Sequence, residues 1–299
     1  MKFKTIISII LIAFCICIII VFLFFHQNPE IPRAIIVDNL ALDGESESGA
    51  DITFVKEAKK ILESTGVEVD YVEVNNVTLE VYQNLARYHL IILRAHSGVL
   101  KNNGAICFFS SEKLIEQKWQ EYREWFSKEY LANATFEHSK ESFIGLKPDF
   151  IRNCLNGEFH NSIVIAMGCN SSINDSMAKA FVDDRKALVY IGWTRDVTAN
   201  HTDFVTLGLL RSFFEKNETI KEAVEKAPAD LKTGAKLTYY PYNEATANLR
   251  PKMIIEELLK MKSSFISVVE VFPRVLLAIL LTLSQLGSVI ENRRFFRKF

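Results

Sequence analysis

The sequence contains little glycine and proline, with 12 and 7 of these residues among 299. This shortage excludes collagen-like and linker-rich chains, and it disfavours all-β folds that need many tight turns. The net charge is only −1, from 35 basic and 36 acidic residues, so the chain lacks the basic field with which proteins bind nucleic-acid phosphates. We therefore expect no nucleic acid among its partners.

Residues suited to holding a metal or a cofactor are also scarce. The five cysteines lie at scattered positions that match neither a zinc site nor a disulfide framework. Histidine and acidic residues do not cluster as metal ligands do, and no glycine-rich phosphate loop is present. The sequence thus predicts no metal and no cofactor, and it leaves open whether Cys107 and Cys154 pair.

The longest apolar run lies near the N-terminus, where residues 6–25 are apolar except for Ser8. As a helix these 20 residues would span about 30 Å, the thickness of the bilayer core. A cleaved signal peptide has a shorter apolar region that ends in small residues, whereas this run ends in Phe22, Leu23, Phe24 and Phe25. We therefore expect residues 1–29 to be an uncleaved transmembrane anchor.

The charges around this run predict its orientation. Lys2 and Lys4 precede it and no basic residue follows it closely, which places the N-terminus in the cytoplasm and the globular domain outside. Glycosylation sequons of the form Asn-x-Ser/Thr agree with this topology. They begin at Asn76, Asn133, Asn170, Asn174, Asn200 and Asn217.

Residues 263–299 contain a second apolar stretch, 265–290, which carries Glu270 and Arg274 and is followed by a basic-aromatic tail from Arg293. Such a segment either spans the bilayer a second time or lies on it as an amphipathic helix. Both alternatives stay open, so we expect a single-pass or two-pass membrane protein whose partners include the lipid bilayer.

Between residues 30 and 262, short apolar runs alternate with segments of helical periodicity. The apolar runs that we expect to be strands are 34–37, 67–74, 90–93, 105–109, 163–167 and 187–191. The expected helices are 52–62, 79–85, 112–131, 176–182, 203–215 and 219–226, and we expect an aromatic loop at 239–242. Because most of these strands are apolar on both faces, the pattern predicts an α/β domain with a mostly parallel sheet of about six strands and helices on both faces.

Two of the expected strands lead directly into chemically active residues. Residues 90–93 are followed by His96, Ser97 and Gly98, and residues 163–167 by Gly168 and Cys169. In open parallel sheets, reactive groups gather at the carboxyl ends of the strands. A thiol needs a base in order to attack a carbonyl carbon at neutral pH, and an imidazole is suited to that task. Nearby glycine lets backbone N–H groups approach a developing oxyanion.

This arrangement resembles the caspase–haemoglobinase fold of cysteine peptidases, which includes caspases, legumains, gingipains and CHAT domains. The resemblance covers residues 34–195 in order and spacing, and residues 177–194 are most similar to the gingipain and CHAT segment that follows the nucleophile. It implies that Cys169 is the nucleophile and His96 the general base and acid. The backbone N–H groups of Cys169 and of Ser97 or Gly98 would then hold the oxyanion.

The chain departs from the family pattern at two points. Ser97 stands where the family usually has glycine after the histidine, and His96 and Cys169 are 73 residues apart, compared with about 50 in caspases. We expect the helix at 112–131 to account for the longer interval as an insertion.

Further candidates for contacting the substrate are Trp193, Asp196 and Asp38, at or near the ends of expected strands. Asp196 and Asp38 would suit a pocket for a basic side chain.

The sequence therefore predicts a membrane-anchored cysteine peptidase that hydrolyses peptide bonds in peptides or proteins. An alternative is a catalytically degenerate caspase-fold module that is tethered to the membrane for binding or assembly. A third interpretation, a doubly wound domain that binds a nucleotide or sugar, lacks a loop to hold phosphate.

Overall fold

The computed structural model describes residues 31–43, 52–101, 103–136 and 140–263. The chain divides into two compact units, residues 32–256 and a unit formed by residues 1–31 with 257–299. Residues 251–263 are helical. The expected membrane segments 6–25 and 265–290 lie outside the described residues, and no helix within the described ranges is both long and apolar enough to cross a bilayer.

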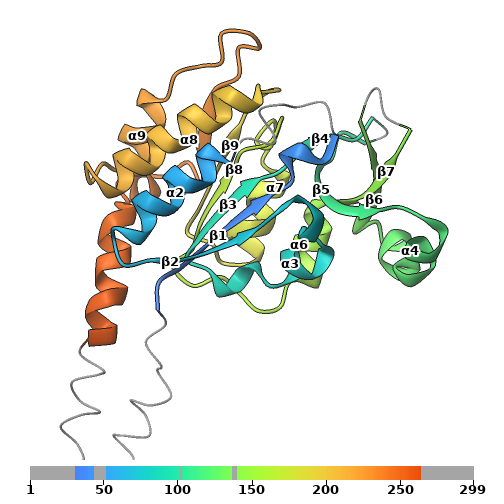
Figure 1. The fold of residues 1–299 in the computed structure, drawn as a ribbon, viewed down its shortest axis with the longest axis horizontal. Helices are drawn as coiled ribbons and strands as arrows, with labels where there is room; N and C mark the ends of the chain where they lie inside the picture. The colour runs from blue at the N-terminus through green and yellow to red at the C-terminus, as the bar shows by residue number, and fades with distance from the viewer. Residues whose placement is uncertain (1–30, 44–51, 102, 137–139, 264–299) are drawn as a thin grey trace, which may run out of the picture. The chain divides into compact units, whose positions relative to one another are not determined.

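A six-stranded sheet forms the centre of residues 32–256, with strand order β10-β9-β8-β3-β1-β2 (Figure 1). Its strands are β1 (Arg33–Asp38), β2 (Glu68–Val72), β3 (Leu90–Arg94), β8 (Ile163–Ala166), β9 (Val189–Trp193) and β10 (Leu237–Tyr240). All neighbouring strands are parallel except β10, which pairs antiparallel with β9. The prediction of an α/β fold with a mostly parallel sheet is therefore confirmed.

Helices cover both faces of this sheet (Figure 1). One face carries α2 (Thr53–Glu63), α8 (Ala199–Phe214) and α9 (Ile220–Lys226), and the other carries α3 (Leu79–Gln83), α6 (Pro148–Cys154) and α7 (Ser176–Lys179). Burial on both faces explains why β3, β8 and β9 are wholly buried and read as unbroken apolar runs. β2 forms one edge of the sheet and is only half-buried, and its sequence largely alternates between charged and apolar residues.

The connecting elements are short. They comprise the 3-10 turns η1 (Leu40–Asp43), η2 (Val74–Asn76) and η3 (Leu85–Arg87), the π turn η4 (Ala180–Asp184) and the helix α10 (Glu244–Ala247). Residues 239–242 were expected to form a loop, which is wrong for Tyr239 and Tyr240, because both lie in the edge strand β10.

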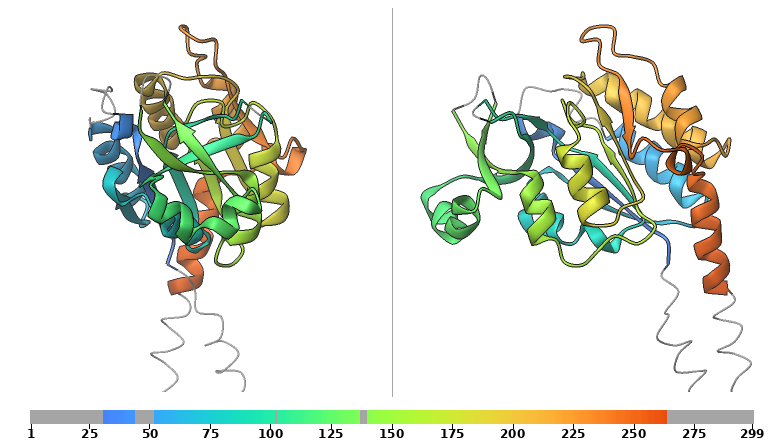
Figure 2. Two further views of the ribbon diagram at one scale, coloured as in Figure 1. Left: turned by 90° about the vertical axis from the view of Figure 1, so that its right-hand side faces the viewer. Right: turned by 180° about the vertical axis from the view of Figure 1, so that it is seen from behind.

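A second, antiparallel sheet lies beside the first, on the side away from α8 and α9 (Figure 2). Its order is β4-β5-β7-β6. The strands are β4 (Ser97–Val99), β5 (Ile106–Lys113), β6 (Leu131–Thr135) and β7 (Ser142–Leu146). The expected strand 105–109 therefore belongs to this sheet and not to the parallel one.

The expected continuous helix over 112–131 is also wrong. β5 continues to Lys113, α4 (Glu116–Glu121) and α5 (Arg123–Ser127) are separated at Tyr122, and β6 begins at Leu131. Neither helix contains a buried residue, so the segment lacks the continuous apolar face that stabilises a long helix against a core. The interval between His96 and Cys169 therefore contains a sheet and two short helices in place of the expected long helix.

Candidate functional site

The segments that carry His96 and Cys169 lie next to each other at the carboxyl ends of the parallel strands. β3 and β8 are direct neighbours in parallel, with Leu93 opposite Ala166, so both chains leave the sheet at the same end. Ser97 Oγ then donates a hydrogen bond of 2.7 Å to the Cys169 carbonyl oxygen. A Cβ atom on Gly168 would lie within 3 Å of Ala95 O and Ser97 Oγ. Glycine at position 168 thus permits the direct contact between the two segments.

His96 is half-buried and is held at two points by the chain that follows β1. Its backbone N–H donates to Asn39 Oδ1 at 2.8 Å, and its Nε2 lies 3.0 Å from Leu40 O. A carbonyl oxygen can only accept a hydrogen bond, so this contact requires the proton on Nε2. In the neutral ring, Nδ1 then carries the lone pair, which is the state a general base needs.

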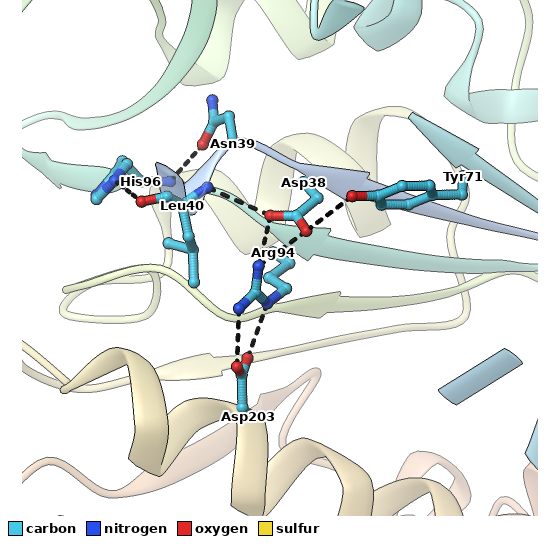
Figure 3. A network of polar contacts seen from close by, with 7 residues as sticks. All are labelled: Asp38, Asn39, Leu40, Tyr71, Arg94, His96 and Asp203. Carbon is cyan, nitrogen blue, oxygen red and sulfur yellow. Dashed lines mark hydrogen bonds and ion pairs between the residues drawn. The ribbon is translucent and has the colours of Figure 1, made fainter. Parts of the chain in front are cut away.

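Behind His96 lies a buried ion network centred on Arg94 (Figure 3). The guanidinium, fully buried at 0% exposure, donates to both oxygens of Asp38 at 2.7 and 2.8 Å. It also donates to both oxygens of Asp203 on α8 at 2.9 and 2.8 Å. Tyr71 adds a hydrogen bond of 3.3 Å to Asp38. One buried cation therefore joins β1, β3 and α8.

The charges of this network depend on one another. Burial raises the pKa of Asp38, and the adjacent Arg94 opposes that rise. Burial also disfavours charge on Arg94, but its hydrogen bonds to Asp203 and the charge of Asp38 hold its pKa above the ordinary value. Arg94 therefore stays charged, and removing either carboxylate would remove two of the hydrogen bonds that its buried guanidinium donates.

The same network supports the turn that holds His96 (Figure 3). Asp38 Oδ1 accepts a hydrogen bond of 3.3 Å from the Leu40 N–H. Asn39 accepts a hydrogen bond from the His96 N–H through Oδ1, and its Nδ2 donates a hydrogen bond of 2.7 Å to the Phe109 carbonyl oxygen. Asp38, the last residue of β1, and the two residues that follow it thus connect the ion network to the backbone and the ring of His96.

Cys169 is half-buried and its thiol contacts the loop after β9. Sγ donates to the Val197 carbonyl at 3.5 Å and accepts from the Val197 N–H at 3.4 Å. Burial raises the pKa of the thiol, the Val197 N–H lowers it, and the neighbouring Asp196 carboxylate raises it again. Because the net shift is upward, the thiol is protonated at neutral pH in this arrangement.

The other predicted residues have different surroundings. Asp38 and Trp193 are buried, at 4% and 0% exposure. Asp38 is engaged by Arg94, and the indole Nε1 of Trp193 donates to Thr202 Oγ1 at 2.9 Å. Asp196 is exposed and accepts a hydrogen bond from Asn170. Of these three residues, Asp196 alone is exposed to solvent beside the thiol.

The sequence analysis missed Arg94, Asn39 and Asp203. A signal for Arg94 existed, because an arginine that ends a wholly apolar strand needs carboxylate partners, although the pattern does not say which carboxylates. Cys107 and Cys154 are buried free thiols, so they do not pair. Within the described ranges, no group of three or more metal-ligating side chains comes together.

The chain matches no protein family model, and no curated protein matches it significantly. What the protein does is therefore inferred from the chemistry and arrangement of its own residues.

Proposed function

We propose that the protein is a membrane-anchored cysteine peptidase of the caspase–haemoglobinase fold that hydrolyses peptide bonds through Cys169 and His96. The observation that supports this most directly is the contact between the two strand ends, bridged by Ser97 Oγ and Cys169 O at 2.7 Å. The strands that lead to the two residues are direct neighbours. The hydrogen bond of His96 to Leu40 O supports Nδ1 as the atom that accepts the thiol proton.

In the proposed reaction, the Cys169 proton passes to His96 Nδ1 while Sγ attacks the carbonyl carbon of the peptide bond. The imidazolium returns the proton to the leaving amine as the C–N bond breaks, and water then hydrolyses the thioester. The raised pKa of the thiol is compatible with this sequence if the proton is transferred only as the substrate binds, displacing the Val197 contact.

The oxyanion would be held by backbone N–H groups of Cys169 and Ser97. In the antiparallel ladder of β4 and β5, Phe109 N donates to His96 O and Leu100 N donates to Ala105 O. In such a ladder, pairs that exchange hydrogen bonds alternate with pairs that do not. This alternation directs the backbone groups of Gly98 toward β5 and those of Ser97 away from it. Ser97 is therefore the better candidate of the two, and its side chain does not prevent this role.

Cleavage of a peptide library by the full-length protein in detergent micelles tests the proposal. Wild-type protein and the control Cys154→Ala should both cleave, since Cys154 is buried and burial raises its thiol pKa to about 11. Cys169→Ala and His96→Ala should each lose activity by at least about a hundredfold. The double variant should lose hardly more, because the two residues act as a unit. Undiminished cleavage by Cys169→Ala would refute the peptidase assignment.

A second candidate function is a caspase-fold module that binds partners at the membrane without catalysis. The upward shift of the Cys169 pKa, which the Asp196 carboxylate reinforces, favours it. Such a module would show no cleavage and no preferential alkylation of Cys169, so the same set of variants separates the two functions.

We further propose that residues 1–29 anchor the protein and that the globular domain faces outside the cytoplasm. Protease treatment of intact cells, with a tag at each terminus, tests this topology. Loss of the domain with both tags protected indicates two spans, and loss of the C-terminal tag together with the domain indicates one. A fully protected domain would refute the outside placement.

A further inference from the structure

The second sheet borders a pocket of about 620 Å³ that the proposed catalytic residues do not occupy. We call it the β4–β6 groove. It is lined by Gly98, Val99, Leu100, Lys101, Cys107, Phe109, Phe126, Glu129, Leu131, Ala132, Asn133, Ala134, Thr135 and Lys147.

The pattern of lining residues shows which part of each strand borders the groove. Side chains alternate between the two faces of a strand, so a strand that presents one face contributes every second residue. β5 does this with Cys107 and Phe109. By contrast, 98–101 and 131–135 line the groove without a gap. The floor is thus a face of β5, whereas the walls are the backbone edges of β4 and β6.

Both edges carry backbone groups that point away from the sheet. The ladder alternation described above leaves the N–H and C=O of Ser97 and Val99 directed away from β5. On the other side, Lys147 N donates to Tyr130 O, so Leu131, Asn133 and Thr135 direct theirs away from β7. Among the described residues, β4 and β6 are each paired on one side only. Such edges can pair with an added strand.

Gly145 leaves room on the face of the sheet that carries Cys107. A Cβ on Gly145 of β7 would lie within 3 Å of Cys107 Sγ and at 3.0 Å from Ala134 Cβ. Side chains from β5 and β6 therefore meet above β7, one of the two inner strands of the sheet. The edge of β6 offers five residues, or about 17 Å of extended chain at roughly 3.4 Å per residue.

We propose that the β4–β6 groove binds an extended segment of the substrate polypeptide as an added β-strand. This inference rests on the proposed peptidase function, because its occupant is the chain to be cleaved. β4 begins at Ser97, directly after His96, and Phe109 of the floor lies 6.1 Å from the His96 ring. A polypeptide bound at Cys169 can therefore continue along β4 without leaving the protein surface.

The lining also specifies the side chains of the bound segment. Residues that face the floor would contact Cys107 and Phe109, both of them buried, and should be apolar. Residues between them would point to solvent and be unrestricted, since main-chain pairing gives affinity and pockets for alternate side chains give specificity. The groove thus selects an alternating apolar segment several residues away from the cleaved bond.

The test uses the full-length Cys169→Ala protein in micelles, which binds without cleaving, and a pool of fluorescein-labelled random decapeptides. The tightest binder is then resynthesised with single N-methyl groups along its length, and binding is measured by fluorescence anisotropy. If the peptide binds as an added strand, the effect of N-methylation should alternate along it with a period of two. Methylation at every second position should weaken binding at least tenfold, and methylation at the positions between should change binding less than twofold. The proposal would be overturned if no peptide binds, or if N-methylation weakens binding without this alternation.

A matched pair of variants locates the binding on the protein. Val99→Pro removes an N–H that points away from β5 and should weaken binding at least tenfold, whereas Val99→Ala keeps the N–H and should change binding less than threefold. Asn133→Pro and Asn133→Ala form the same pair on β6. If proline and alanine change peptide binding equally at both positions, the proposal is overturned. It is also overturned if the chain self-associates and Val99→Pro abolishes that self-association while peptide binding persists.

The two proposals fail in distinguishable ways. Periodic binding by Cys169→Ala without cleavage by the wild-type protein would remove the peptidase assignment and leave a strand-binding groove. Cleavage that depends on Cys169, combined with peptide binding that lacks the period, would remove the groove alone.

Discussion

Replacement of Asp203 by alanine should destabilise the protein strongly, because it removes a carboxylate that binds the buried cation of Arg94 at two points. Arg94 is fully buried, and the Asp203 side chain that faces it is only 15% exposed. The substitution removes hydrogen bonds of 2.9 and 2.8 Å from Arg94 and leaves the carboxylate of Asp38 bound to Arg94 (Figure 3).

The size of the effect follows from two independent considerations. Two hydrogen bonds to charged groups contribute roughly 1.5–3 kcal/mol each, or about 3–6 kcal/mol together. Removing one partner of a buried ion pair costs about 3–5 kcal/mol when the other charge is left alone, and this is an upper limit here because Asp38 still neutralises Arg94. We therefore expect Asp203→Ala to lower the free energy of unfolding by up to about 3–5 kcal/mol.

Urea unfolding followed by tryptophan fluorescence measures this change, since all three tryptophans lie within residues 32–256. The matched control is Asp149→Ala, which removes an ion pair to Arg152 whose side chains are 45% and 30% exposed. An exposed pair of this kind contributes at most about 1 kcal/mol. If Asp203→Ala costs no more than Asp149→Ala, the network does not stabilise the fold as described.

Three further substitutions probe the surroundings of the site. Gly168→Ala places a Cβ within 3 Å of neighbouring backbone and should lower stability by about 1–3 kcal/mol; an unchanged urea midpoint would contradict the close contact between the two segments. Asp196→Asn removes a charge that raises the pKa of Cys169, so alkylation of this thiol by iodoacetamide at neutral pH should become several-fold faster, and an unchanged or slower rate would contradict it. Thr202→Val leaves the Trp193 indole N–H without its hydrogen bond and should cost about 1–3 kcal/mol in urea unfolding; a stabilised variant would be incompatible with that bond.

The parallel sheet was predictable because burial on both faces leaves a simple signature. Residues 90–93 and 163–167 are continuous apolar runs of strand length, and both prove to be central strands. Because the carboxyl ends of parallel strands lie at the same end of a sheet, these two runs were sufficient to predict that His96 and Cys169 lie close together.

The second sheet was not predictable for the opposite reason. β4 has three residues, and β6 reads Leu-Ala-Asn-Ala-Thr, so neither shows a hydrophobic pattern of its own. Their stability comes from pairing with distant strands, and such pairing is invisible to a local reading of propensity. The expected helix over 112–131 failed for the same reason.

The ion network behind His96 is also a product of long-range contacts. Arg94 and Asp203 are separated by 109 positions, and Asp203 lies on a helix whose sequence contains no sign of a buried partner. Asp38 was singled out because it ends a strand, but it was expected to contact substrate, whereas its carboxylate binds Arg94 inside the protein.

Trapping the nucleophile tests whether Cys169 and His96 act as a catalytic pair. The full-length wild-type protein is treated with a pool of peptidyl electrophiles, and the modified cysteine is identified by mass spectrometry. We expect one adduct, on Cys169, that forms at least about a hundredfold more slowly in His96→Ala and at an unchanged rate in Cys154→Ala. Equal modification of Cys107, Cys154 and Cys169, or a rate on Cys169 that His96→Ala leaves unchanged, would contradict the proposed pair.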